Sequence, residues 1–180
     1  MRKGSDPKTG DEIIGPTATV GRKGRVLPGD DMTTTPDPAF AGRTYPAGPV
    51  HTISAAKIAE FARATGASSP VHLDPEAARA AGHADVIAPP TFLVSLAQAT
   101  ESQYIEDPAA GIDFTRVVHG EESFTLHRPV VAGDRLVPTL TVESVRATGG
   151  HAMIATRVDM ADESDAEVAS VRSMIVVRGD

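Results

Sequence analysis

The chain has 180 residues, of which 41 % are hydrophobic, and this is enough for one domain with a real core. Its five Phe, two Tyr and no Trp predict a core of aliphatic side chains. The formal net charge of −7 and the absence of any long basic run argue against a nucleic-acid-binding surface. Without cysteine there are neither disulfides nor thiolate metal sites, and no apolar run reaches the roughly 18 residues of a membrane span. We therefore expect a cytoplasmic protein.

The first 40 residues differ in composition from the rest of the chain. They are rich in Pro, Gly and scattered charges, and their one apolar patch is the pair Ile13-Ile14. Such a stretch buries too little surface to offset the entropy cost of ordering it. We therefore predict a disordered tail over residues 1–40 and a single domain over residues 41–180. Met32 is an alternative start, in which case residues 1–31 would not be translated.

Capping residues predict two helices early in the domain. Ser54 can accept hydrogen bonds from the free amides of a first helical turn, and Gly66 is a typical C-terminal stop. Asp74 followed by Pro75 has the pattern of a second helix start, and Gly82 ends that helix. The residues between the two helices have the composition of a loop.

A third helix is expected over residues 91–105, after an extended approach fixed by Pro89-Pro90. Its first half is apolar on most sides, which is typical of a helix buried in the protein interior. Glu101 and Glu106 are interpreted as the point where the helix emerges into solvent, and Asp107-Pro108 ends it.

The rest of the chain changes to a period of two. Apolar and polar residues alternate around residues 124–126, 136–142, 152–160 and 168–178, with turn residues between these runs. Four strands joined by short turns predict an antiparallel meander, and Pro138 indicates a bulge or an edge position. Helices followed by strands predict an α+β fold, and a sheet curled around the buried helix is one option among several helix-on-sheet folds.

The segment Phe61–Asp74 resembles the signature loop of MaoC-like dehydratases and (R)-specific enoyl hydratases. That family's pattern is roughly Gly-Asp-x-Asn-Pro-x-His-x-Asp, and Gly66, Pro70, His72 and Asp74 match it. The resemblance implies a single hot-dog fold, in which an antiparallel sheet wraps around a central helix.

Further motifs extend the resemblance to residues 41–178 in the family's order. Asp85–Phe92 looks like the approach to the family's central helix, and His127–Leu136 is similar to its strand-turn-strand hallmark. Ala88-Pro89-Pro90, where the family usually has Ala-His-Gly, and Gly120-Glu121 resemble the N-terminal-type subunits (FAS1-type dehydratase region) of actinobacterial (3R)-hydroxyacyl-ACP dehydratases. Those subunits commonly pair with a second, catalytically complete hot-dog subunit.

The signature loop departs from the family at its chemically essential position. The resemblance implies an Asp and a His that together act as general acid and base across the C2–C3 bond of the substrate. His72 stands at the family's His position, but Ala67 stands at the Asp position and Ser69 at that of the supporting Asn. The methyl group of Ala67 cannot accept a proton. For His72 the alternative is an inherited loop histidine that a neighbouring carbonyl holds.

Three residues are candidates for substrate binding. The backbone N–H of Thr91 or Phe92, at the start of the central helix, can polarise a thioester carbonyl, whereas Pro90 has no N–H to donate. Arg128 is a candidate for the phosphate of CoA or of an acyl-carrier arm, with a solvated strand charge as the alternative. The remaining histidines lack the spacing of a metal site, and the resemblance implies no cofactor.

The resemblance, together with the missing Asp at position 67, implies a subunit of a (3R)-hydroxyacyl-thioester dehydratase/enoyl hydratase, a lyase of fatty-acid metabolism. The chain would bind acyl-CoA or acyl-ACP, or complete a dimer, while a MaoC-type partner supplies the intact Asp/His pair; a homodimer remains open. One alternative is a non-catalytic acyl-thioester-binding hot-dog homodimer. Another is a thioesterase, for which Glu101 is the candidate carboxylate on the central helix.

Overall fold

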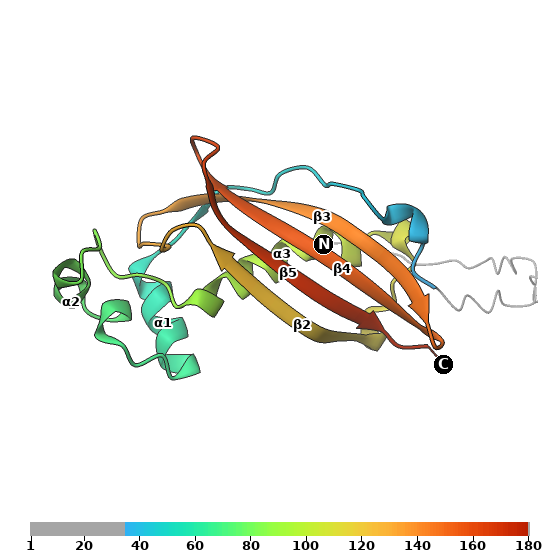
Figure 1. Ribbon diagram of the computed structural model, residues 1–180, viewed down its shortest axis with the longest axis horizontal. Helices are drawn as coiled ribbons and strands as arrows, with labels where there is room; N and C mark the ends of the chain where they lie inside the picture. The colour runs from blue at the N-terminus through green and yellow to red at the C-terminus, as the bar shows by residue number, and fades with distance from the viewer. Residues whose placement is uncertain (1–34, 180) are drawn as a thin grey trace, which may run out of the picture. The chain divides into compact units, whose positions relative to one another are not determined.

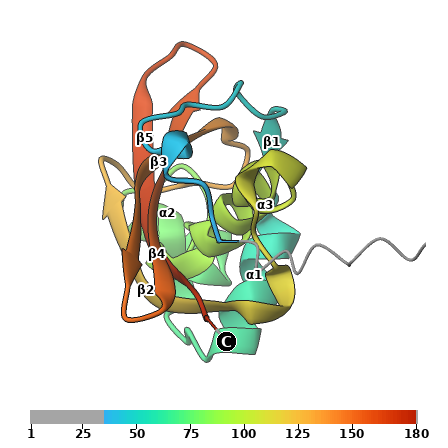
Figure 2. The same ribbon diagram turned by 90° about the vertical axis from the view of Figure 1, so that its right-hand side faces the viewer.

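The computed structural model describes residues 35–179. The expectations for residues 1–34, including the alternative start at Met32, lie outside the described residues. Figure 1 and Figure 2 show one curled antiparallel sheet with the helices gathered on its concave side.

The described residues form a five-stranded sheet in the order β1-β3-β4-β5-β2, with every neighbouring pair antiparallel. The strands are β1 (His51–Thr52), β2 (Val117–Leu126), β3 (Arg135–Thr148), β4 (His151–Asp162) and β5 (Glu167–Val177). The meander is therefore confirmed for β3, β4 and β5. It is wrong for β2, which pairs with β5 rather than with the next strand in the chain. The alternation of residues within β2 cannot predict which strand pairs with it. The connection after β2 carries the chain across to the other side of the sheet, where β3 begins.

Three α-helices precede most of the sheet, and their capping follows the sequence signals. They are α1 (Ala55–Thr65), α2 (Pro75–Ala80) and α3 (Val94–Ile105). The side chain of Ser54 accepts from the Lys57 amide, and that of Asp74 accepts from the Glu76 amide. Gly66 ends α1 in the left-handed conformation, with φ 73°. No helix within residues 35–179 is long and apolar enough to cross a membrane.

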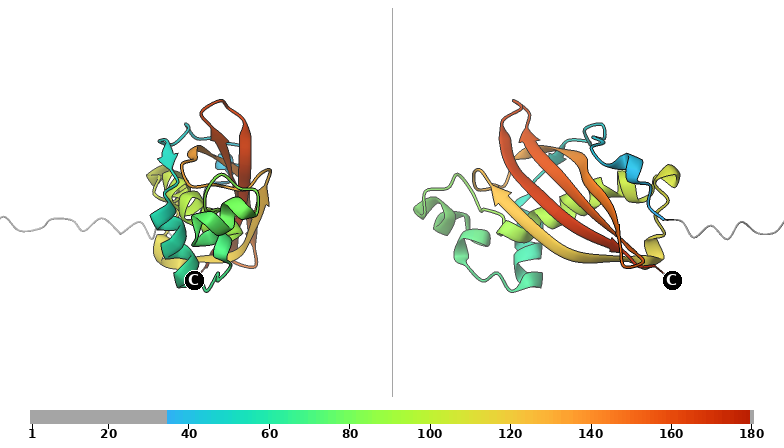
Figure 3. Two further views of the ribbon diagram at one scale, coloured as in Figure 1. Left: turned by 90° about the vertical axis from the view of Figure 1, so that its left-hand side faces the viewer. Right: turned by 45° about the vertical axis from the view of Figure 1, so that its right-hand side comes forward.

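The central helix α3 lies against the concave face of the sheet, as the views in Figure 3 show. A 3-10 turn, η3 (Pro90–Leu93), precedes it, so the expected helix begins with a tighter turn. Leu93, Ala97 and Tyr104 are fully buried, whereas Ser95 and Gln98 on the other side are exposed. The expectation that Glu101 marks the emergence into solvent is wrong, because its side chain is 0 % exposed and accepts a hydrogen bond from Thr156 of β4.

The edge of β3 beyond the short β1 is covered by an extended segment, residues 42–48. The amide of Tyr45 donates to the Leu140 carbonyl and that of Gly48 donates to the Pro138 carbonyl, each at 2.8 Å. Pro138 thus lies where β3 borders an irregular segment instead of a regular strand, which suits a residue without an N–H. The register shift of β3 falls between Val142 and Ser144 rather than at Pro138.

The end of the segment expected to be disordered makes ordered contacts. Residues 38–40 form a 3-10 turn, η1 (Pro38–Phe40), which the side chain of Asp37 caps. The ring of Phe40 is 6 % exposed, and its centroid lies 5.5 Å from that of Tyr104. Residues 37–40 therefore belong to the domain and cover the C-terminal end of α3.

Replacing Phe40 by Ala should lower the free energy of unfolding by about 3 kcal/mol, because it removes a buried ring and leaves a cavity against Tyr104. Urea denaturation of the two proteins measures the difference. Phe114→Ala is the matched control, since the ring of Phe114 is 71 % exposed and its loss should change the stability little. Equal stability of the Phe40 variant and the parent protein would contradict the packing of this segment.

Candidate functional site

The signature loop joins α1 to α2 at one end of the domain (Figure 1). Its conformation follows from local signals: Gly66 reverses the chain, the Ala67 amide returns to the Ala62 carbonyl at 2.8 Å, and residues 70–72 form the 3-10 turn η2 (Pro70–His72). Asp74 then caps α2. The loop thus has a defined shape without any side-chain carboxylate at position 67.

His72 is held by the backbone. Its Nδ1 lies 2.8 Å from the carbonyl oxygen of Ile87, and its ring is half-buried. Because a carbonyl oxygen accepts and does not donate, the proton must be on Nδ1, and a neutral ring then has an unprotonated Nε2. This contact is the one expected for a loop histidine held by a neighbouring carbonyl. It also leaves Nε2 as an acceptor for water or for a substrate hydroxyl.

The structure gives His72 no carboxylate from the family's Asp position. Ala67 is half-buried and ends in a methyl group, and Ser69 is exposed. The arrangement can therefore accept or donate one proton at His72, but it lacks the second group that an acid/base pair needs.

A short extended segment, residues 86–88, connects the signature loop to the turn after β2. The Ile87 amide donates to the Val71 carbonyl at 3.1 Å, and Ile87 forms an isolated β-bridge with Val131. The Ala88 amide donates to the Val130 carbonyl at 2.8 Å. The carbonyl that holds His72 is thus fixed from the side of the sheet.

Arg128 stabilises that same turn. Its Nη1 donates to Asp134 Oδ2 at 2.7 Å, and the same oxygen accepts from the Val131 amide at 2.8 Å. The hydrogen bond with Asp134 raises the pKa of Arg128 above its ordinary value. Because this carboxylate already balances the charge of Arg128, phosphate binding by Arg128 stays a prediction.

At the start of the central helix, Thr91 is exposed and Phe92 is buried. The Phe92 amide donates to the Pro89 carbonyl at 2.9 Å, which leaves the Thr91 amide as the candidate carbonyl-binding donor. The Phe92 ring meets the Phe61 ring of α1 edge-on, at 5.4 Å between centroids.

A cavity of about 370 Å³ opens beside this ring pair, with Phe61, Phe92 and Leu96 among its lining residues and Lys57 and Glu60 of α1 also contributing. His72 does not line this cavity. The lining of this cavity thus includes Phe92 at the start of the central helix but not the histidine.

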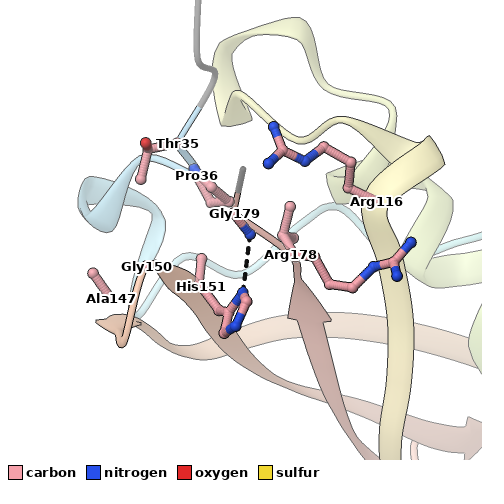
Figure 4. A pocket seen from close by; sticks show the side chains of 10 residues that line it. Thr35, Pro36, Arg116, Ala147, Gly150, His151, Arg178 and Gly179 are labelled. Atoms are coloured by element: carbon pink, nitrogen blue, oxygen red, sulfur yellow. Dashed lines mark hydrogen bonds between the residues drawn. The ribbon is translucent and has the colours of Figure 1, made fainter.

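A smaller hollow of about 280 Å³ lies at the other end of the sheet, where β4 begins and β5 ends (Figure 4). Arg116, His151 and Arg178 line it, and the Gly179 amide donates to His151 Nδ1 at 3.0 Å. These basic residues lie at the opposite end of the molecule from the signature loop. They add nothing to the chemistry of His72.

A third cavity, of about 500 Å³, lies between the second half of α3 and the start of β2, and Glu101 lines it. The charge of this side chain alone predicts a position in solvent, but its spacing along the helix predicts burial. Glu101 follows Leu93 and Ala97 at intervals of four residues, so it shares their buried face.

Comparison with known proteins relates the whole domain to dehydratases. The family model described as FAS1-like, dehydratase domain region, matches residues 39–171. A UPF0336 protein of Clavibacter michiganensis subsp. michiganensis is 54 % identical over 144 residues, which are 80 % of this chain and 97 % of the relative. A UPF0336 protein of Streptomyces griseus subsp. griseus is 45 % identical over 142 residues, 79 % of this chain and 95 % of the relative.

Solved structures share the architecture. A MaoC-like dehydratase superposes with a TM-score of 0.73 and 28 % identity, covering 78 % of this chain and 43 % of that one. The C-terminally truncated HadBC (3R)-hydroxyacyl-ACP dehydratase complex of Mycobacterium tuberculosis gives a TM-score of 0.68 at 24 % identity, covering 76 % of this chain and 96 % of that one. The expected α+β hot-dog fold, a sheet wrapped around a central helix, is thereby confirmed.

Replacing Asp134 by Ala should lower the free energy of unfolding by about 2 kcal/mol, because the Arg128 guanidinium and the Val131 amide both lose their acceptor. Thermal or urea denaturation measures the loss. Glu163→Ala is the control: it breaks an Arg–carboxylate contact of the same 2.7 Å length, with Arg135, on the solvent-exposed surface. A loss for Asp134→Ala no larger than that of the control would show that the turn does not depend on Asp134.

Proposed function

We propose, because this chain belongs to the FAS1-like, dehydratase domain region family, that it is a subunit of a (3R)-hydroxyacyl-thioester dehydratase or enoyl hydratase. In this proposal it binds the acyl-CoA or acyl-ACP substrate or completes the dimer. A second hot-dog subunit contributes the intact Asp/His pair.

One observation supports the proposal that two subunits share the proton transfers. The signature loop keeps its shape, with Gly66 in the left-handed conformation and His72 fixed to the Ile87 carbonyl, while position 67 holds a methyl group. Hydration of an enoyl thioester needs one group to activate the water and one to deliver a proton to the α-carbon. His72 Nε2 can serve for one of these two transfers, so the other has to come from outside this loop.

The open edge of the sheet supports a partner subunit. β2 is the last strand in the sheet order, so its outer backbone edge has no neighbour within the described chain. The apolar side chain of Val118 on β2 is 45 % exposed. A ten-residue strand with a free edge and an exposed apolar side chain is a surface that proteins usually cover. We propose that a second hot-dog subunit covers it, in a heterodimer or in a homodimer.

For the acyl thioester we propose the cavity beside Phe61 and Phe92. Its aromatic and aliphatic walls suit the hydrocarbon next to a thioester, and the exposed Thr91 at the start of η3 offers the remaining helix-start amide to the carbonyl. Arg128 bonds Asp134 through Nη1, so the other N–H groups of its guanidinium would contact the phosphate of the carrier.

Two other functions remain in view. A non-catalytic acyl-thioester-binding homodimer would use the same cavity without any proton transfer. A thioesterase would use Glu101, which lines a cavity but lies late in α3. Hydration of a trans-enoyl-CoA, hydrolysis of a saturated acyl-CoA and binding of acyl-CoA distinguish the three.

The purified chain alone should hydrate a trans-enoyl-CoA slowly or not at all, whereas the chain mixed with a MaoC-type subunit should exceed the sum of the separate rates. The loss of the enoyl absorbance measures the rate. Full activity of the chain alone would contradict the proposal. Binding without hydration in both preparations would favour the homodimer, and hydrolysis of the saturated ester would favour the thioesterase.

Replacing Ala67 by Asp should raise the hydration rate of the chain alone by about tenfold to a hundredfold, because it adds a second proton-transfer group to the loop that holds His72. Ser68→Asp is the matched control, since it adds the same charge at the next, exposed position. An equal rate for both variants would mean that the loop no longer presents position 67 to the substrate.

A further inference from the structure

The most unusual polar group in the described chain is Glu101, in the second half of α3. Its side chain is 0 % exposed. One carboxyl oxygen, Oε1, accepts a hydrogen bond of 2.6 Å from Thr156 Oγ1 on β4. The other, Oε2, is buried and has no hydrogen-bond partner among the described residues.

Such an arrangement is unfavourable for folding alone. A buried carboxyl oxygen without a donor loses its hydration and gains nothing in return. An apolar side chain of similar size, packed between α3 and β4, would avoid that cost. Glu101 is therefore better suited to something that enters the site than to the stability of the domain.

Glu101 is one of the residues that line the cavity of about 500 Å³ between α3 and the start of β2. Ile105, Phe114 and Val117 supply apolar walls, and Gln98 and His119 contact each other on another side through Nε2 and Nδ1 at 3.2 Å. A largely apolar pocket of this volume with few polar groups is the usual form of a small-molecule site.

The acidic groups around the cavity disfavour an anionic ligand. Glu101 and Glu106 line it, with no Lys or Arg among its lining residues. Glu122 on β2 is near enough that desolvation and the charge of Glu101 raise its pKa above the ordinary value. A carboxylate or phosphate would meet this negative field at close range.

We propose that this cavity binds a neutral, largely aliphatic molecule that carries a hydroxyl group, and that Glu101 Oε2 is the partner of that hydroxyl. A hydroxyl group both donates and accepts, so it satisfies Oε2 whether the carboxyl group is ionised or protonated. The hydrocarbon part of the ligand lies against Ile105, Phe114 and Val117. The proposal does not depend on the dehydratase role or on His72.

The first test uses the full chain in its native oligomeric state and needs no substitution. Calorimetric titration with n-hexanol should show saturable binding about tenfold tighter than n-hexyl chloride, which has a similar shape but no hydroxyl group. Hexyl chloride is the more hydrophobic of the two, so a hydroxyl preference cannot come from partitioning. Equal binding, or tighter binding of the chloride, would overturn the proposal. Tighter binding of n-hexylamine than of n-hexanol would overturn the neutral character of the ligand.

The second test separates a binding role from a structural one. The double variant Glu101→Met with Thr156→Val replaces both buried partners by apolar groups of similar size, so it should melt at a higher temperature than the parent protein and lose the preference for hexanol. The control Glu106→Gln, an exposed position at the same cavity, should keep both the preference and the melting temperature. A double variant that melts lower and still prefers hexanol would show that Glu101 is structural.

Discussion

The contact between α3 and the concave face of the sheet determines where the other parts of the domain can lie. Ala97 of the helix and Leu93 of the preceding turn η3 lie in one buried core with aliphatic side chains of the sheet such as Leu140 and Val158. Aromatic rings are used at the two ends of the helix instead: Phe61 with Phe92 at its start, and Phe40 and Tyr45 with Tyr104 at its end.

This arrangement also fixes the signature loop, but indirectly. The segment of residues 86–88 leads into the helix and is hydrogen-bonded to Val71 on one side and Val130 on the other. His72 is held by the Ile87 carbonyl within that segment. Gly66 and Asp74 serve as helix caps. The preserved residues of the motif thus all have folding roles, so the motif is good evidence for the fold and weak evidence for catalysis in this chain.

The same distinction explains which features could be predicted from the sequence. Ser54, Gly66 and Asp74 cap helices through contacts within one helical turn. Their roles could therefore be predicted from the local sequence. The position of β2 beside β5 depends on partners about fifty residues away, and alternation along one strand carries no information about its neighbour. The two-residue β1 is too short to give any period. The ordered turn at Phe40 depends on Tyr104, which no local composition reveals.

In the candidate site, too, one feature was easy to predict from the sequence and another was not. The missing carboxylate at Ala67 was visible in the sequence, because the resemblance defined what should stand there. The burial of Glu101 could be predicted only from its spacing of four residues from the buried Ala97, because its charge alone predicts a position in solvent.

The signature loop has a defined shape with a methyl group at the half-buried position 67, so the fold of this loop does not require an acid there. Keeping an unsatisfied acid under a sheet works against stability, and local rules are typically broken in this way at functional positions. The two positions therefore differ: residue 67 of this chain is an Ala without any acid/base group, whereas Glu101 is a buried acid whose Oε2 has no hydrogen-bond partner among the described residues.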